Sequence, residues 1–297
     1  MILKNNMELA QNDFNNEKEL QIFFEKNIEK ILGFKFVETE FSVGNFRIDT
    51  LAFDEETKSF KIIEYKNVKN YSLIDQGYTY LKLLLEKKAD FVLKYNIKNQ
   101  TCFTIDDIDW SQSRIIFVSP TFTQYQLNAT DFKNIPVDLI KVTRYQDDII
   151  NIDFIEKKSN VKIQELNLDN DYKTVNKEVV VYTEEDHLNK VPSYIKKLYD
   201  ILKERVLELD DIDVDVKKVY IAFKGKTNII DVELFQKSIC ITFNLKKGWL
   251  DDPTNIAEDI SSKGHHGNGD YRVFIKTEAD IDMVMPLIRQ SLNYNKK

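Results

Sequence analysis

The sequence has few of the residues that build disulfide frameworks, zinc sites or flexible linkers. Among 297 residues there are two cysteines, three histidines, five prolines and eight glycines. Cys102 and Cys240 lie far apart, in what we expect to be different domains, so we expect reduced thiols in a cytoplasmic protein. A disulfide or a metal-binding cysteine pair is not expected, and the scarcity of histidine argues against a histidine-rich zinc site.

Long apolar runs are also missing. No window approaches the 18 consecutive apolar residues of a membrane-spanning helix, so we expect no membrane partner. Residues 1–16 are polar with scattered acids and lack the apolar core of a signal peptide. A chain of 297 residues is long enough to form two domains, each with its own hydrophobic core.

The chain has no excess of positive charge. Its formal net charge is −7. Residues 1–155 contain 19 Lys and Arg against 24 Asp and Glu, and the remainder contains 23 against 25, so neither half is basic. This balance argues against a protein that grips nucleic acid through bulk electrostatics. A metal-dependent nuclease stays compatible with it, because a bound cation itself screens the phosphate.

The sequence does contain two candidate strands that could pair, and each carries an acidic residue that would lie beside the other. Residues 60–66 are expected to form a strand in which Ile62, Glu64 and Lys66 share one face. Residues 46–53 form a second candidate strand, which contains Asp49. The polar segment between them is short enough for a hairpin connection, which would place Asp49 beside Glu64. Two adjacent carboxylates can bind a hard divalent cation such as Mg²⁺, and a nearby Lys can offset charge on a phosphate.

A helix is expected to follow from Ser72 to about Lys88. Gln76 and Tyr80 are four residues apart and therefore lie on one face of it. Gly77 costs a helix roughly 1 kcal/mol relative to Ala, which suggests a close approach to backbone or ligand. Gln76 and Tyr80 either position a substrate or only hydrogen-bond a neighbouring strand, and the sequence leaves both interpretations open.

The order of these residues resembles the signature of the PD-(D/E)XK phosphodiesterase superfamily. Asp49 is followed by Glu64-Tyr65-Lys66 and then by Gln76-Gly77-Tyr78-Thr79-Tyr80, which looks like the Gln-x-x-x-Tyr element of the RecB-like branch. The resemblance is closest to NucS-like endonuclease domains. Many relatives carry Gly immediately before the Arg of Arg-Ile-Asp, whereas this chain has Phe46 there. Gly44 lies two residues earlier, so the local turn can differ without moving Asp49.

The resemblance implies a deoxyribonuclease that depends on Mg²⁺ or Mn²⁺. Asp49 and Glu64 would bind the metal, with the backbone carbonyl of Tyr65 as a further ligand. Lys66 would orient the water or neutralise developing charge, and Gln76 and Tyr80 would position the phosphate or Lys66. An acid from the first helix often lies near the metal in this superfamily, and Glu17 fits that place. The implied catalytic residues are Glu17, Asp49, Glu64, Lys66, Gln76 and Tyr80.

The first helix is expected from Glu17 to Leu32. Asn16 is a favourable N-cap, Glu19 completes a pattern like a capping box, and Gly33 ends the helix. Glu17 lies on the same face as the apolar residues of this helix. The alternative interpretation is that Glu17 is only a first-turn acid that the helix dipole favours.

The alternation of helices and strands predicts an α/β first domain over residues 1–158, with a PD-(D/E)XK-type mixed sheet flanked by helices. Further strands are expected at residues 36–41, 90–95, 114–118, 137–145 and 148–155, and a helix at 121–132. Residues 159–183 turn polar and are predicted to be a linker. Residues 184–297 are predicted to form a smaller α+β domain with an antiparallel sheet. It resembles a C-terminal module of unknown function that is often fused to such nucleases.

The most unusual stretch of the second domain is Gly264-His265-His266-Gly267-Asn268-Gly269-Asp270. It contains three of the eight glycines and two of the three histidines of the chain. A loop that contacts a ligand or nucleic acid is one interpretation, and a tight connection between two elements is the other. The second domain as a whole is compatible with a role in substrate recognition or regulation.

Two classes of function follow for the whole chain. The first is a metal-dependent DNA endonuclease, in repair or in defence, acting on single-stranded, branched or duplex DNA that the sequence does not distinguish. The second is a module on the same fold that binds nucleic acid or protein without cutting. The intact acidic pair and Lys66 favour the nuclease, while the acidic net charge keeps the binding module open. A homodimer is compatible with either class.

Overall fold

The computed structural model describes residues 3–4, 6–66, 73–159, 161 and 170–296. The chain divides into two compact units, Met1–Val181 and Tyr182–Lys297. Each unit has a hydrophobic core of its own. Within the described residues, no helix has both the length and the apolar character that crossing a membrane requires.

The first unit is built on a six-stranded mixed sheet, as the sequence predicted. The outer pairs β3–β4, β4–β5 and β7–β8 are antiparallel, whereas β5, β6 and β7 run parallel to one another. In the order of the sheet the strands are β3 (Lys35–Val43), β4 (Phe46–Asp54), β5 (Ser59–Tyr65), β6 (Arg114–Ser119), β7 (Val137–Arg144) and β8 (Ile150–Ile155).

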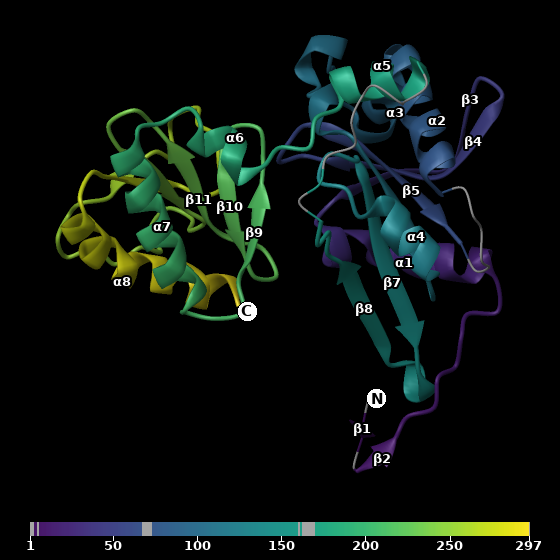
Figure 1. Cartoon of the computed structure of the whole chain (residues 1–297), viewed down its shortest axis with the longest axis horizontal. Helices are drawn as coiled ribbons and strands as arrows, with labels where there is room; N and C mark the ends of the chain where they lie inside the picture. The colour runs from purple at the N-terminus through teal and green to yellow at the C-terminus, as the bar shows by residue number, and fades with distance from the viewer. Residues whose placement is uncertain (1–2, 5, 67–72, 160, 162–169, 297) are drawn as a thin grey trace. The chain divides into compact units, whose positions relative to one another are not determined.

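Helices cover both faces of this sheet, which makes three layers (Figure 1). Helix α1 (Glu17–Leu32) packs Leu20, Phe24 and Ile28 on one face, against residues such as Ile63 and Val118. The Asn16 side chain caps this helix by accepting from the Glu19 N–H, and Gly33 ends it in the left-handed region, as predicted. The other elements of the unit are β1 (Leu3–Lys4), β2 (Met7–Glu8), α2 (Leu73–Glu86), α3 (Lys88–Asn99), α4 (Gln124–Thr130), α5 (Asn170–Glu178) and three short 3₁₀ turns.

Helix α2 lies on the opposite face from α1. A Cβ added at Gly77 would lie 3.1 Å from Ile115 Cγ2 and 3.3 Å from Val137 Cγ2. The close approach at Gly77 is therefore made to side chains of strands β6 and β7, and not to the backbone or ligand that the sequence suggested. The expected cap of this helix, Ser72, lies outside the described residues.

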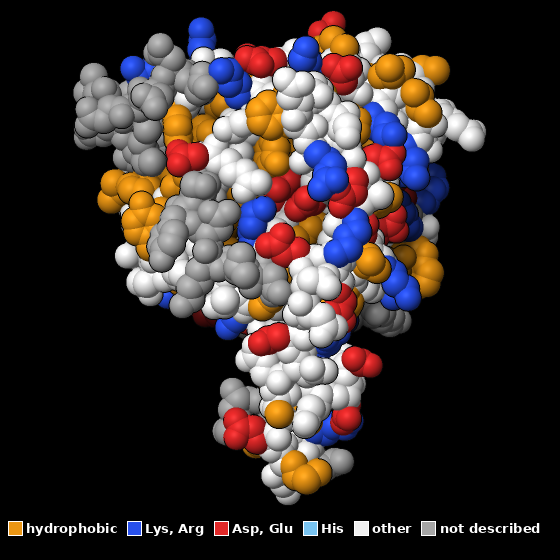
Figure 2. All heavy atoms as spheres, turned by 90° about the vertical axis from the view of Figure 1, so that its right-hand side faces the viewer, with side chains coloured by type: hydrophobic (Ala, Val, Ile, Leu, Met, Phe, Trp, Pro, Cys, Tyr) orange, Lys and Arg blue, Asp and Glu red, His pale blue; other side chains and the backbone are white. Residues whose placement is uncertain are grey.

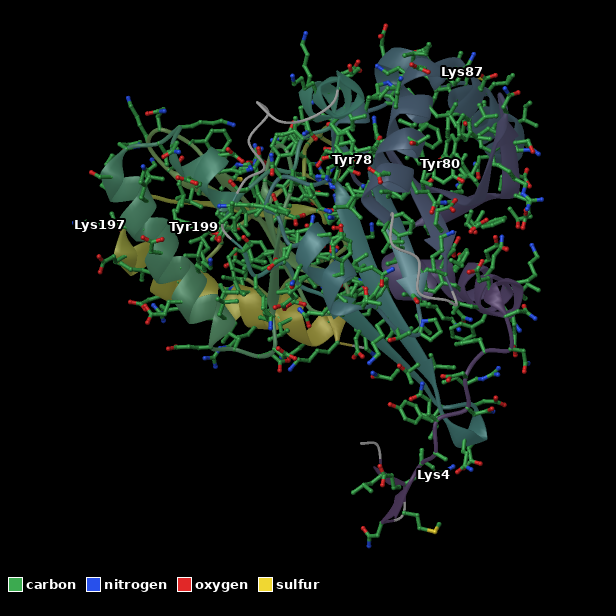
Figure 3. The ribbon with its side chains drawn as sticks, turned by 45° about the vertical axis from the view of Figure 1, so that its right-hand side comes forward. Lys4, Tyr78, Tyr80, Lys87, Lys197 and Tyr199 are labelled. Carbon is green, nitrogen blue, oxygen red and sulfur yellow. The ribbon has the colours of Figure 1, made fainter. Side chains whose placement is uncertain are left out.

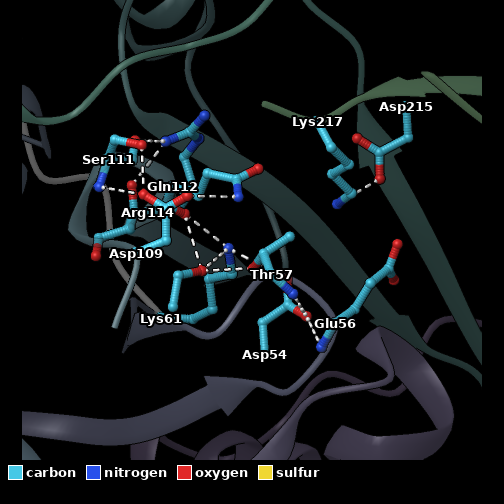
Figure 4. A network of polar contacts seen from close by, with 12 residues as sticks. Asp54, Glu56, Thr57, Lys61, Asp109, Ser111, Gln112, Arg114, Asp215 and Lys217 are labelled. Carbon is cyan, nitrogen blue, oxygen red and sulfur yellow. Dashed lines mark hydrogen bonds and ion pairs between the residues drawn. The ribbon is translucent and has the colours of Figure 1, made fainter. Parts of the chain in front are cut away.

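The β4–β5 hairpin is held at its turn by a buried charge pair (Figure 4). Lys61 Nζ donates to Ser59 Oγ at 2.9 Å and to the Gln112 carbonyl at 2.8 Å, and lies 3.4 Å from Asp54 Oδ2. The other carboxylate oxygen of Asp54 accepts from the backbone N–H of Thr57. A buried charge pair that also makes hydrogen bonds is costly to break. The contacts therefore fix the register of the hairpin.

Residues 90–95 are helical, so the strand predicted there is wrong. They lie within α3, where Phe91, Val92 and Tyr95 are buried and Leu93 is 59% exposed. A strand would bury every second residue, including Leu93, whereas the observed spacing follows the helical period.

The first unit continues beyond the boundary expected at residue 158. Helix α5 falls within the predicted linker, and Val175 of this helix and Val179 just after it lie in the core of the unit. Tyr172 stacks on Tyr78 of α2 with ring centroids 4.2 Å apart, and Arg114 Nη2 donates to the Val180 carbonyl at 2.8 Å. The segment is polar because only one side of its helix is buried. The structure therefore places the boundary between the two units after Val181.

The second unit is an α+β domain with an antiparallel sheet, as predicted. Its strand order is β13-β14-β12-β11-β10-β9. Helices α7 and α8 contribute apolar residues to its core, among them Ile195, Leu202, Ile281 and Ile288. Its elements are α6 (Glu184–Leu188), α7 (Ser193–Leu207), β9 (Asp213–Val216), β10 (Ile221–Lys224), β11 (Asn228–Leu234), β12 (Ile239–Phe243), β13 (Glu258–Asp259), β14 (Tyr271–Ile275) and α8 (Glu278–Asn295).

Helix α5 should be part of the cooperative core of the first unit. In a chain ending at Val181, Val175→Ala should lower the free energy of unfolding by about 2 kcal/mol, because it removes two buried carbons and leaves a cavity. The exposed neighbour Lys173 gives a matched control, whose replacement by Ala should cost no more than about 0.5 kcal/mol. Urea unfolding followed by Trp110 fluorescence measures both. Equal midpoints for the two variants would show that α5 lies outside the cooperative unit.

Candidate metal and phosphate site

Asp49 and Glu64 lie side by side where β4 meets β5. The ladder pairs Thr50 with Ile63, which brings the preceding Asp49 to Glu64. The Asp49 N–H donates to Glu64 Oε1 at 3.1 Å, and the Tyr65 N–H donates to Asp49 Oδ2 at 3.1 Å. Each carboxylate is thus oriented by the backbone of the other's strand. The structure brings together the two acids that the hairpin argument expected.

The pair is held in an environment that disfavours two negative charges. Glu64 is 2% exposed, and burial, followed by the charge of Asp49, raises the pKa of Glu64 to about 8. Burial also raises the pKa of Asp49, and the charges of Glu40 and Glu17 act in the same direction. The Tyr65 N–H and the Lys66 ammonium oppose this shift of the Asp49 pKa. A cation placed between the carboxylates would relieve the repulsion.

Lys66, Gln76 and Tyr80 lie around this pair. Lys66 Nζ is 3.7 Å from Glu64 Oε2, and Gln76 Nε2 donates to the same oxygen at 2.8 Å. The Tyr80 hydroxyl donates to the Arg47 carbonyl at 3.1 Å. Figure 3 shows Tyr78 and Tyr80 on α2, and Tyr80 reaches the strand that carries Asp49. Both α2 side chains therefore hydrogen-bond neighbouring strands, and Gln76 fixes the orientation of Glu64.

Glu17 stands at the start of α1, where it is half-buried and contributes to the electrostatics of Asp49. Gln21, one turn later on α1, contacts Asp49 directly. Gln21 is 3% exposed, and its Nε2 donates to the Asp49 carbonyl at 2.8 Å and to Glu25 Oε1 at 2.9 Å. The sequence analysis missed Gln21. Its signal was a polar residue next to Leu20 on the apolar side of the helix.

Glu40 is a second residue that the sequence analysis missed. Thr39 pairs with Thr50 and Phe41 with Ile48, so Glu40 and Asp49 lie opposite each other between these two pairs. Glu40 has a φ of 50°, in the left-handed region. The Lys18 ammonium beside it holds the pKa of its carboxyl below the usual value, and Arg47 acts in the same direction. No sequence pattern marks a left-handed glutamate inside a strand.

The donor set suits a hard divalent cation. Asp49 and Glu64 supply carboxylate oxygens, and Mg²⁺ is commonly bound by one or two carboxylates together with water and substrate phosphate. Within the residues that the structure describes, no group of three or more His, Cys, Asp or Glu side chains is arranged to hold a metal ion. A cation here would therefore depend on the two carboxylates, a backbone oxygen such as that of Tyr65, and ligands from outside the protein.

The Gly/His loop of the second unit packs on its own sheet. Asp231 of β11 is 1% exposed and accepts from Asn228 Nδ2 at 2.9 Å and from the Asn268 N–H. A Cβ at Gly269, whose φ is 105°, would lie 1.8 Å from the Phe243 carbonyl oxygen. The ring nitrogens of His265 each lie 2.8 Å from a carbonyl of the same loop. These contacts favour the interpretation of a tight structural connection.

Comparisons with known proteins give matches to the second unit and to the whole chain. Residues 184–295 match a family described as a domain of unknown function, DUF5655. The whole chain is 45% identical over 288 residues to an uncharacterized protein of Haemophilus influenzae, an alignment that spans 96% of this chain and 95% of that protein. The chain therefore belongs to the same protein family as that uncharacterized protein.

Two solved structures show partial likeness. A structure of an EndoMS-dsDNA2 complex is 20% identical with a TM-score of 0.29, over 43% of this chain and 45% of that one. A repair endonuclease from Pyrococcus abyssi is 19% identical with a TM-score of 0.28, over 41% of this chain and 45% of that one. The likeness thus spans less than half of either protein, and both scores lie below 0.5.

The buried acidic pair should weaken the fold when no metal is added. Because the pKa of Glu64 is raised to about 8 in the folded state, the folded protein binds more protons than the unfolded one between about pH 4.5 and 8. Its unfolding free energy should therefore fall as the pH rises through this window, by at most about 1.4 kcal/mol per pH unit. Glu64→Gln should remove the part of this fall that comes from Glu64 and leave the part that comes from Asp49, whose pKa is also raised. Urea unfolding in EDTA at several pH values measures it.

The exposed Glu29 of α1 provides the control for this experiment. Glu29→Gln should keep the wild-type pH dependence. Mn²⁺ should stabilise the wild type more than Glu64→Gln. Identical pH profiles for the wild type and Glu64→Gln would contradict the assignment of Glu64 as a destabilised buried acid.

Proposed function

We propose that the first unit is a metal-dependent DNA endonuclease of the PD-(D/E)XK type, and that Mg²⁺ or Mn²⁺ is its cofactor. One observation carries the proposal: Asp49 and Glu64 are mutually oriented through the 3.1 Å hydrogen bonds of the β4–β5 hairpin, with the Lys66 ammonium 3.7 Å from Glu64. A buried acid pair beside a cation has little structural use by itself, because it costs stability. It is suited to binding a cation and a phosphate together.

Each residue has a role that its contacts allow. The bound metal would polarise the scissile phosphate and offset its charge. Asp49 and Glu64 would hold the metal, with the Tyr65 carbonyl as a further ligand. Gln76 would keep Glu64 turned towards the metal through its 2.8 Å hydrogen bond. Lys66 would stabilise negative charge that develops on the phosphate oxygens.

Residues at the edge of the site act indirectly. Gln21 holds the Asp49 backbone, and Glu17 supplies a further negative charge that favours a cation near Asp49. Tyr80 fixes the backbone of Arg47 on β4, the strand that carries Asp49.

Repair and defence both require a nuclease that discriminates between forms of DNA. A panel of single-stranded, branched, mismatched and duplex substrates would separate these possibilities.

The acidic pair should be essential for cleavage. Asp49→Asn and Glu64→Gln should each lower metal-dependent nicking of plasmid and single-stranded DNA by at least about 100-fold, because each removes a charged ligand of the metal. Both variants should stay folded, since loss of one charge relieves repulsion in the pair. Circular dichroism and Mn²⁺ calorimetry provide the controls. Full cleavage by purified Glu64→Gln protein would refute the proposed nuclease function. DNA binding without cleavage by the wild type would favour the alternative, a binding module that does not cut.

Lys66 should affect turnover more than affinity. Lys66→Ala should lower kcat by about 100-fold or more and weaken DNA binding by much less, because its charge is needed where negative charge develops. Lys66→Arg should restore only part of the rate, since a planar guanidinium does not replace a compact ammonium. Single-turnover cleavage and fluorescence anisotropy separate the two effects. Equal losses of rate and affinity would make Lys66 a simple phosphate clamp.

A further inference from the structure

Two cations converge on Glu40 beside the acidic pair. Lys18 Nζ lies 2.8 Å from Glu40 Oε1, and Arg47 Nε lies 2.8 Å from Glu40 Oε2. Lys18 belongs to the first turn of α1, and Arg47 precedes Asp49 by two residues on β4. The carboxylate of Glu40 thus holds two cations from different elements. The three side chains together keep one unit of positive charge.

Both cations stay open to solvent although they are held in place. The side chain of Lys18 is 53% exposed and that of Arg47 is 68% exposed. Glu40 Oε2 is buried and has no well-directed hydrogen bond within the described residues, so its contact with Arg47 is an ion pair only. The planar donors of the guanidinium therefore remain able to bind a phosphate in a forked geometry.

Stability alone does not account for this arrangement. Glu40 adopts a φ of 50° inside a strand, a conformation that costs a residue with a side chain more than an exposed ion pair returns. Such strain persists where the surrounding structure requires a side chain at one place. In this protein the required position lies opposite Asp49, where the carboxylate of Glu40 binds both the Lys18 ammonium and the Arg47 guanidinium.

We propose that Lys18 and Arg47, anchored by Glu40, form a subsite for a backbone phosphate of the nucleic acid next to the phosphate bound at Asp49 and Glu64. The inference rests on the proposed nuclease function and adds a second point of attachment to it. It would also allow a chain of net charge −7 to bind nucleic acid, because a few placed cations would replace a broad basic surface. Figure 2 shows Lys and Arg interspersed with Asp and Glu on the face that it views.

The salt dependence of binding tests the subsite without any cleavage. A fluorescent oligonucleotide is titrated with Glu64→Gln protein in EDTA at several salt concentrations. Adding Lys18→Ala and Arg47→Ala together should reduce the slope of log Kobs against log salt by about 1.4 for a single strand, or about 1.8 for a duplex, because two phosphate contacts are lost. Each single variant should give about half of this reduction.

Lys35 provides the matched control. It lies at the other end of β3 and pairs with Glu55 at 3.1 Å, with 37% of its side chain exposed. Lys35→Ala should leave the slope unchanged. An unchanged slope in the Lys18 and Arg47 double variant would overturn the subsite, and so would a slope that Lys35→Ala lowers equally.

The two proposals can fail separately. If the wild type cuts DNA with Mn²⁺ and the double variant keeps the slope of the Glu64→Gln protein from which it is made, the subsite proposal is wrong and the nuclease proposal is unaffected. If the wild type cuts no substrate while the double variant shows the reduced slope, the nuclease is wrong and the phosphate subsite stands. Thermal unfolding of the double variant shows that the compared proteins are folded.

Discussion

The register of the β4–β5 hairpin determines whether this protein has a site at all. Thr50 faces Ile63 and therefore Asp49 meets Glu64. A slip of one residue would turn Glu64 to the other face of the sheet and separate the acids. The turn of the hairpin opposes such a slip, because Lys61 and Asp54 are both buried and are bound to each other and to the Gln112 carbonyl. A structural ion pair at one end of the hairpin thus secures the acids near the other.

The two charge groups of the hairpin have opposite consequences. Lys61 and Asp54 compensate each other, so their burial is tolerated. Asp49 and Glu64 repel each other, and the hydrogen bonds from two backbone N–H groups and from Gln76 offset only part of that cost. Buried acids whose ionisation is opposed in this way are typical of positions kept for function, because stability would favour their replacement. The contrast within one hairpin is the strongest physical argument for a ligand at Asp49 and Glu64.

The parts of the fold that could be predicted are those with local signals. The Asn16 cap and Gly33 bound α1, and short runs of apolar residues mark β4, β5 and β6. Helix α5 was missed because its stability comes from packing: Val175 is buried in a core whose other residues are mostly distant in sequence. The same distinction holds at the site. Asp49, Glu64 and Lys66 follow from strand periodicity, whereas Gln21 and Glu40 act through tertiary contacts and a left-handed backbone that no local pattern encodes.

Net negative charge and a phosphate ligand are compatible if the cations are placed one by one. Lys66 lies beside Glu64, Lys18 and Arg47 lie beside Glu40, and Glu40 faces Asp49 across the ladder. Each cation is therefore adjacent to a carboxylate, which holds the side chain in place and lowers the rotamer entropy that binding would cost. The same carboxylates reduce the attraction for polyanions at long range. In the proposed nuclease, such a site would bind a phosphate weakly until a metal neutralised Asp49 and Glu64, after which the cations would act on the phosphate with less opposition. Metal binding and nucleic-acid binding would thereby be coupled through the same four acids, Glu17, Glu40, Asp49 and Glu64.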